Sequence, residues 1–220
     1  MKKRITRFLT LFVACLVAIT VFAIPQTENA NADTGSVYCK VKFSKQMTLE
    51  EMPFAYTYYK LDMGKAAKGK TVTVKIKEGN SIEVVKSGKK IYLMPVEKGR
   101  TKITIKVGKK NYTSTVKVVS FKSHIKSFKV GKKNITKEYN GDEVSNRTGI
   151  SIKPGKKTTI TVKPEKGWKV MKITYDGKKI KNGKPVKIHK DRDPETASQI
   201  VIELYNAKRM VTLPYMLYVS

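Results

Sequence analysis

The sequence contains few of the residues that build covalent frameworks or metal centres. It has two cysteines, two histidines and one tryptophan among 220 residues. Cys15 lies in an N-terminal apolar run, which leaves Cys39 without a partner for an internal disulfide. The fold must therefore be held by core packing. Cys39 sits in an expected strand over 37–41, so we predict a buried, unreactive thiol.

No group of residues has the spacing of a metal site. Zinc needs three or four ligands, and Cys39, His124 and His189 are far apart in the sequence. One acidic cluster comprises Asp191, Asp193 and Glu195. It is interleaved with basic residues and lacks the glycine-containing loop of a calcium site. We predict no metal and no cofactor.

Motifs for known catalytic chemistry are also missing. The sequence has no Gly-x-Ser-x-Gly, no His-Glu-x-x-His and no phosphate-binding loop. The Gly-Lys-Lys-Thr stretch at Gly155 lacks the upstream glycine of such a loop and fits a hairpin turn. We predict that the protein is not an enzyme and has no catalytic residues. A secreted hydrolase of unrecognised type is a minor alternative, for which Asp191 and Asp193 are the only local candidates.

Negative charge is scarce, because 17 acidic residues face 46 lysines and arginines, giving a formal charge of +29. Nearly all the basic residues are lysines, which suit diffuse attraction better than bidentate recognition. A field of this kind attracts polyanions, although lysines also serve simply to keep a surface soluble. The charge therefore predicts an anionic polymer or glycan as partner, with solubility as the competing explanation.

Residues 1–32 have the pattern of a cleaved signal peptide. A basic start is followed by an apolar run over 8–24, and Ala30 and Ala32 supply the small residues that a signal peptidase accepts. We expect cleavage after Ala32, secretion, and no transmembrane anchor afterwards. The last segment, 215–219, is expected to be a strand, with no covalent wall anchor. The exported chain keeps a charge near +26.

Alternating apolar residues and regularly spaced turns predict an all-β chain. Gly-Lys-Lys recurs at Gly88, Gly108, Gly131, Gly155 and Gly177. Strand-like segments flank each of these turns, which is typical of the hairpins of a β-sandwich. We expect strands over 71–77, 158–163 and 200–204, the last of them central. One short helix is expected over 48–52, from a capping-box pattern followed by proline.

The stretch from Ser81 to Val107 resembles the bacterial Ig-like repeats (group 2) of invasin- and intimin-type adhesins. The resemblance covers about residues 60–119 and rests on a strand, the turn at Gly88, a second strand, and Gly99-Arg-Thr-Lys-Ile-Thr-Ile. It departs from the family where a tryptophan is usual, since 74–78 reads Val-Lys-Ile-Lys-Glu. The second half is similar in style only, with Trp168 as an expected core residue. The resemblance implies a non-catalytic spacer, adhesion or wall-associated module.

Two sets of residues are candidates for ligand binding. Exposed tyrosine rings stack on sugars, and turn lysines attract anions. The candidates are Tyr56, Tyr58, Tyr59, Lys89, Lys90, Lys109, Lys110, Lys132 and Lys133. The alternation of Phe54, Tyr56 and Tyr58 also fits an ordinary core face, and we favour that interpretation. Lysines at 75, 77, 102, 106 and 163 are expected on outer strand faces.

The sequence therefore predicts a signal peptide over 1–32 and two small tandem β domains, an Ig-like sandwich over 33–120 and a sandwich-like domain over 121–220. A linker is expected over 120–127, and one elongated domain is the alternative. The predicted function is a secreted, strongly basic, non-catalytic protein that associates with the cell envelope or extracellular polyanions. The alternative is an adhesion module with a defined face for a glycan or another surface protein. No specific nucleic-acid binding is expected.

Overall fold

The computed structural model describes residues 36–51, 56–137, 149–150, 152, 155–188 and 198–219. Strands dominate these residues, with one 3-10 turn, η1 (Gly64–Ala67). Several sequence predictions fall outside the described residues: the signal peptide with its cleavage site, Phe54, His189, Asp191, Asp193 and Glu195.

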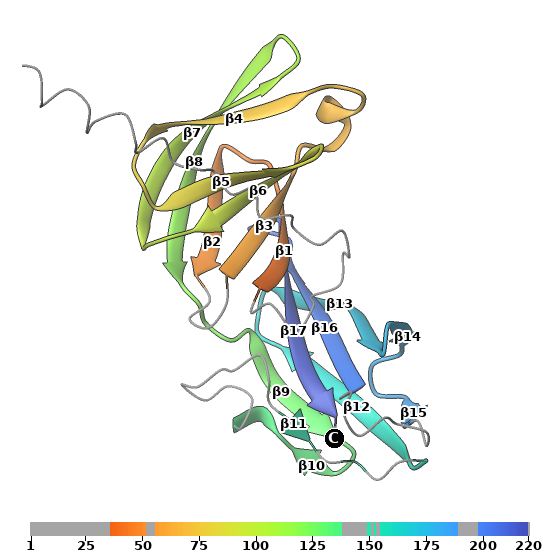
Figure 1. Cartoon of the computed structure of the whole chain (residues 1–220). Helices are drawn as coiled ribbons and strands as arrows, with labels where there is room; N and C mark the ends of the chain where they lie inside the picture. Colours follow the sequence, from red (N-terminus) through yellow and green to blue (C-terminus); the bar gives the residue numbers. More distant parts are fainter. Residues whose placement is uncertain are drawn as a thin grey trace, which may run out of the picture.

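The first half of the chain forms two sheet layers (Figure 1). One layer contains, in order, β1 (Ser36–Lys42), β3 (Tyr56–Asp62), β6 (Lys90–Pro95) and β5 (Ile82–Ser87). The other contains β2 (Gln46–Glu51), β8 (Lys110–Ser120), β7 (Gly99–Val107) and β4 (Val72–Glu78). Two neighbouring pairs are parallel, β1 with β3 and β2 with β8, and the other pairs are antiparallel.

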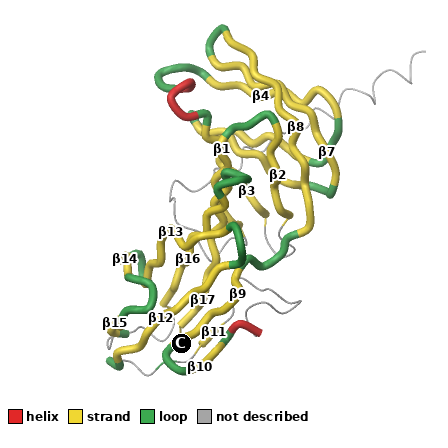
Figure 2. The backbone as a smooth tube through the Cα atoms, turned by 180° about the vertical axis from the view of Figure 1, so that it is seen from behind, coloured by secondary structure: helices red, strands yellow, loops and turns green. Residues whose placement is uncertain are grey.

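The second half repeats the two-layer arrangement (Figure 2). One layer contains β10 (Lys133–Asn134), β9 (Ile125–Val130), β12 (Lys157–Pro164) and β15 (Pro185–Lys187). The other contains β14 (Lys178–Ile180), β13 (Trp168–Tyr175), β16 (Ser198–Asn206) and β17 (Val211–Val219), with β11 (Gly149–Ile150) also paired to β17. The fold is thus an all-β tandem sandwich, as the sequence predicted.

A single sheet passes through both halves, because the strand that opens the described chain pairs with the strand that closes it. β1 and β17 are antiparallel, with Lys40 opposite Thr212 and Val41 opposite Val211. This pairing joins the layer that contains β1 in the first half and the layer that contains β17 in the second half into one nine-stranded sheet, called here the shared sheet. Only residues 121–124 separate β8 from β9. The boundary near residue 120 remains a prediction.

The core follows the period-two alternation of the strands. Val37, Cys39 and Val41 of β1 point inward, as do Ile200, Ile202 and Leu204 of β16. Full burial of one such side chain contributes about 1.5–3 kcal/mol. The sequence correctly placed Cys39 and Trp168 in the core and 200–204 in a central strand, since β16 lies between β13 and β17.

The Gly-Lys-Lys motif marks hairpins, as predicted, at Gly88, Gly108, Gly131 and Gly177. The hairpin expected at Gly155 is wrong, because β12 after it pairs with β9 and β15, whereas β11 before it pairs with β17. Gly88, Gly108 and Gly131 open two-residue loops with φ of 56°, 58° and 59°. Glycine suits this position because side chains at positive φ clash with the backbone. In the loop between β13 and β14, Asp176 and Gly177 both have positive φ, at 45° and 75°.

The helix expected over 48–52 is wrong, because β2 extends over Gln46–Glu51. Met47 and Leu49 are buried, and the strand runs parallel to β8 with Leu49 opposite Val118. The local capping pattern is thus overridden by pairing with a strand about 70 residues later.

Candidate functional site

The tyrosines of β3 point to the opposite faces of the sheet from those favoured from sequence. Tyr56 is 67% exposed and Tyr58 half-buried, whereas Tyr59 is 0% exposed. Thr57, Tyr59 and Leu61 form the core-facing side of the strand. Aromatic residues occupy both alternating sets here, so periodicity alone does not say which set faces inward. The core assignment of Tyr56 and Tyr58 is corrected, and Tyr59 is removed from the candidate surface.

Three tyrosines form a cluster on the outer face of the shared sheet. Tyr38 and Tyr58, opposite one another on β1 and β3, stack with ring centroids 5.4 Å apart at 19°. Tyr92 of β6 meets Tyr38 and Tyr58 edge-on at 6.0 and 6.2 Å. Burial raises the pKa of both Tyr38 and Tyr58, and neighbouring tyrosines add to the shift. Tyr38 and Tyr58 therefore stay neutral at ordinary pH and present half-buried rings, whereas Tyr92 is only 6% exposed and supports them from the side.

A row of polar and aromatic side chains crosses the same face, one from each of six adjacent strands. In order these are Tyr92, Lys60, Lys40, Thr212, Tyr205 and Lys169. Each neighbour is a direct cross-strand partner of the next, so the row is fixed by the backbone register. The Lys169 amine lies 5.3 Å from the centroid of the Tyr205 ring. This set is called the cross-strand row below.

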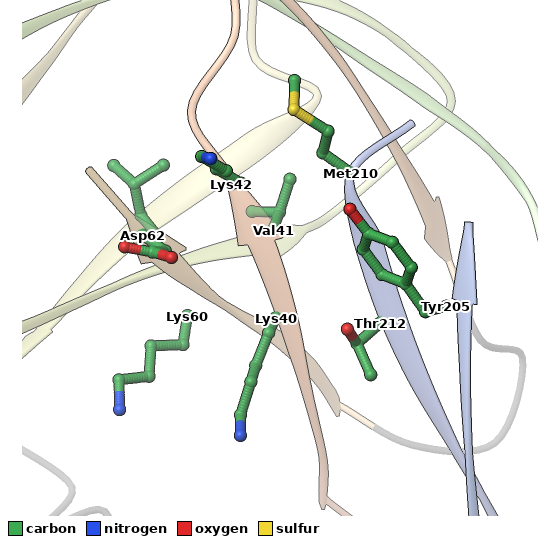
Figure 3. Close-up of a pocket in the computed structure, with 9 residues that line it drawn as sticks. Lys40, Val41, Lys42, Lys60, Asp62, Tyr205, Met210 and Thr212 are labelled. Carbon is green, nitrogen blue, oxygen red and sulfur yellow. The ribbon is translucent and has the colours of Figure 1, made fainter. Parts of the chain in front are cut away.

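A pocket of about 440 Å³ opens in the middle of the row, where β1 meets β17 (Figure 3). Lys40, Lys42, Lys60, Tyr205 and Thr212 line it. The side chains of Lys40 and Lys60 extend from neighbouring strands toward the same side (Figure 3). Asp62, Met210 and the strand residues Val41 and Leu61 complete the lining. Three cations against one carboxylate make the pocket a candidate site for an anion.

Lys40 and Lys60 are direct partners across the parallel β1–β3 pair. Like charges in directly opposed positions destabilise a sheet. The neighbouring pair on the same strands is complementary, since Lys42 lies opposite Asp62. The lysine pair is therefore a local cost to the sheet that a bound anion would relieve.

The six lysine candidates from the sequence lie at three hairpins. Lys89, Lys109 and Lys132 occupy the second position of two-residue loops. The next strand begins in each case with the following lysine, at 90, 110 and 133. None of the six is among the residues that line the pocket on the shared sheet. They add positive charge at strand ends without gathering with Tyr56 and Tyr58 into one site.

A second basic surface covers the outer face of the β2–β8–β7–β4 sheet. Its exposed members include Lys75, Arg100, Lys102, Lys106 and Lys117. Cross-strand partners place threonines among them, with Lys75 opposite Thr104 and Lys102 opposite Thr115. The sequence placed the lysines at 75, 77, 102 and 106 on outer strand faces, and all four are exposed. This surface is called the lysine face below.

The interior between the two halves contains a buried ionic cluster centred on Glu50 of β2. Arg209, in the β16–β17 turn, forms a salt bridge with its carboxylate. His124 Nε2 lies 2.9 and 3.0 Å from the two carboxylate oxygens. An ionised carboxylate only accepts hydrogen bonds, so Nε2 carries the proton. The His124 ring stacks on Trp168 with centroids 4.0 Å apart.

Hydrogen bonds from the flanking strands hold this cluster in place. The Tyr59 hydroxyl donates to the Glu50 carbonyl and accepts from the Glu50 amide, both at 2.9 Å. The His124 amide donates to the Tyr215 hydroxyl at 3.1 Å. Burial raises the pKa of Cys39 and of Tyr59 well above their usual values. The segment expected to be a linker is thus a packed contact between the halves.

Across the described ranges, no three His, Cys, Asp or Glu side chains are grouped to hold a metal ion. Nor does the described part of the chain include a helix long and apolar enough to cross a membrane.

Lys40, Lys42, Lys60 and Tyr205 were missed as site residues in the sequence. The only local signal is the alternation of tyrosine with lysine at Tyr38-Cys-Lys40 and Tyr58-Tyr-Lys60. These residues come together only because β1 pairs in parallel with β3 and antiparallel with β17. Neither pairing can be recognised from the local sequence.

The chain matches no protein-family model and no curated protein. Among solved structures, the tandem Ig repeats of Dlar are 13% identical with a TM-score of 0.35, over 82% of this chain and 95% of that one. Domains 4–9 of the surface-layer protein SbsC are 14% identical with a TM-score of 0.23, over 69% and 26%. The Bacteroides ovatus protein SGBP-B, from a mixed-linkage glucan utilisation locus and solved with a heptasaccharide, is 13% identical with a TM-score of 0.20, over 81% and 46%. Similarity at this level transfers no function, and membership of the invasin/intimin-type family remains a prediction.

Proposed function

We propose that this protein is a secreted, non-catalytic Ig-like module that is retained at the cell envelope or extracellular matrix by binding anionic polymers. The lysine face is the observation that supports this most directly. Lysines on three adjacent strands point to solvent from one sheet, interspersed with threonines. Such a surface attracts a polyanion without requiring a particular sequence or bond pattern in it.

Other features support the same proposal. The N-terminal segment has the pattern of a secretion signal, and the charge of +29 is shared over the chain. The hairpin lysines at 89, 109 and 132 extend the positive field to the strand ends. Some lysines are paired with carboxylates, such as Lys172 with Glu203 at 4.0 Å, but 46 lysines and arginines outnumber 17 acidic residues. Most of the positive charge is therefore in excess of what the protein's own carboxylates can neutralise.

The test is co-sedimentation of the purified protein with Gram-positive cell walls, with and without their teichoic acids, over a salt series. Binding should require teichoic acid and fall steeply as the Debye length shrinks from about 10 Å at 0.1 M salt to about 3 Å at 1 M. The triple change Lys75→Ala, Lys102→Ala and Lys106→Ala should weaken binding and flatten the salt dependence. Protein that stays in the supernatant at low salt would contradict the proposal.

A second candidate function is adhesion through a defined glycan-binding face. The tyrosine cluster and the pocket beside it favour this candidate, since both lie on one sheet face. It predicts binding that survives high salt and depends on tyrosine rings, unlike binding by the lysine face.

A further inference from the structure

We propose that the cross-strand row is a specific site for an acidic polysaccharide, with an anionic group of the polymer in the pocket and sugar rings against the tyrosines. The inference rests on the proposed function, because it names the ligand class and the part of the surface that selects it. The lysine face would supply general attraction, and the row would supply selectivity.

The first step concerns charge at the pocket. Lys40 and Lys60 are directly opposed on β1 and β3, and adjacent strands are about 4.8 Å apart. Both side chains line one pocket together with Lys42. A sulfate, phosphate or carboxylate placed between them offsets their repulsion. The row is therefore better suited to an acidic ligand than to a neutral one.

The second step concerns the aromatic surface beside the pocket. Tyr58 precedes Lys60 by two residues on the same strand face, and Tyr38 precedes Lys40 in the same way. Tyr56, further along β3, is 67% exposed. A sugar whose anionic group lies in the pocket has aromatic surface next to it on this side. Tyrosine rings offer an apolar face for the C–H side of a pyranose and a hydroxyl at the edge.

The third step concerns the choice between a glycan and a nucleic acid. Tyr38 and Tyr58 stack on one another at 5.4 Å, with Tyr92 edge-on to both. Because Tyr38 and Tyr58 are stacked on each other, no base can insert between them. The solvent-facing side of these two half-buried rings and the exposed Tyr56 ring stay available to the C–H side of a sugar. Thr212 and Tyr205 add hydroxyl groups beside the lysines, which match the hydroxyls of a sugar. The row has no arginine for bidentate contacts to phosphate or base edges.

The fourth step concerns length. The row takes one residue from each of six adjacent strands, from β6 to β13. At the usual strand spacing this spans roughly 24 Å. The pocket lies at the seam where β1 of the first half meets β17 of the second. The ligand is therefore a polymer laid across the strands, which contacts both halves at once.

The test compares binding of the purified full-length protein to four probes by calorimetry at 0.15 M salt. The probes are dextran sulfate, uncharged dextran, inorganic polyphosphate and polyuridylate. Two double variants each remove two lysines from one face: Lys40→Ala with Lys60→Ala in the row, and Lys102→Ala with Lys106→Ala on the lysine face. Tyr58→Leu removes a ring without changing charge. Circular dichroism and thermal unfolding establish that each variant is folded.

Dextran sulfate should bind the protein, and uncharged dextran should not. The row double variant should lose at least about tenfold more affinity for dextran sulfate than the lysine-face variant, and Tyr58→Leu should lose about tenfold. On polyphosphate, which has anionic groups but no sugar ring, Tyr58→Leu should bind as the parent does.

Equal losses of dextran sulfate binding in the two double variants would overturn the site and leave the proposed function standing. Polyuridylate binding that is tighter than dextran sulfate binding and lost in Tyr58→Leu would overturn the glycan assignment. If the parent protein binds none of the charged probes even at low salt, the proposed function fails as well, which separates the two failures.

Discussion

The two sides of the seam between the halves hold charge in opposite ways. On the inner side, the Glu50 carboxylate is buried and meets both Arg209 and His124. On the outer side, Lys40 and Lys60 face each other across neighbouring strands. The inner charges are complementary, with the Glu50 and His124 side chains buried and the Arg209 side chain partly exposed. The outer charges are alike and open to solvent, which suits a ligand from outside.

Neutralising Glu50 should produce the largest effect on stability. Glu50→Gln keeps the size of the side chain but leaves the Arg209 guanidinium and the protonated Nε2 of His124 without their carboxylate. Breaking a buried pair in this way costs about 3–5 kcal/mol, and we expect about 3 kcal/mol because the Arg209 side chain is 37% exposed. Urea unfolding measures the change.

Glu83→Gln is the matched control, because Glu83 is exposed on β5, and its effect should stay within about 0.5 kcal/mol. A loss below about 1 kcal/mol in Glu50→Gln would mean that the inner cluster contributes little to holding the halves together.

Tyr59→Phe should have the next largest effect. The hydroxyl makes two hydrogen bonds to the backbone of Glu50 in a buried setting. Removing it leaves a buried amide and carbonyl without this partner, at a cost of about 1–3 kcal/mol. Tyr58→Phe, on the half-exposed side of the same strand, serves as the control and should be nearly neutral. Similar losses in both variants would contradict the distinction between the two faces.

The same pair of variants separates the faces at alkaline pH. The pKa of Tyr59 is raised well above its usual value by burial, so it stays neutral in the folded protein while the unfolded chain loses that proton. Its contribution is complete below pH about 10 and declines as the pH rises further, by up to about 1.4 kcal/mol per pH unit. The alkaline decline in urea stability should be shallower in Tyr59→Phe than in the parent protein.

The smallest expected effect is a gain. Lys60→Thr removes one of two opposed like charges on the outer side and should stabilise the fold by about 0.2–0.5 kcal/mol at low salt. The gain should disappear at high salt, where the repulsion is screened. Lys75→Thr, on the edge strand β4 where the cross-strand partner is Thr104, should show no such salt-dependent gain. A loss of stability in Lys60→Thr would show that the lysine pair is not a cost to the sheet.

The sequence predicts elements of this fold well where one local pattern dominates. Gly88 and Gly108 fix hairpins whose partners are adjacent in the chain, and 158–163 lies inside β12 as expected. Prediction failed where a distant strand decides, as in the segment expected to be a helix, whose residues 48–51 pair with β8. It also chose the wrong face at Tyr56 and Tyr58, because aromatic residues occupy both sides of β3.

The candidate site was the least predictable part, for the same reason. Tyr56 and Tyr58 were identified as possible ligand-binding residues, but Lys40, Tyr205 and Thr212 were not. Their proximity depends on β1 lying between β3 and β17. Cross-strand neighbours from separate halves share no spacing that a single sequence displays.

The pairing of Val41 with Val211 also implies an order of folding. β1 lies near the start of the described chain and β17 near its end, so the contact between them has a sequence separation of nearly the whole described chain. Each half contains its own hairpins, so the strands within each half can pair before β1 and β17 do. The pocket, however, exists only once β17 has arrived beside β1. Ligand binding would then distinguish a finished molecule from a shortened or half-folded one.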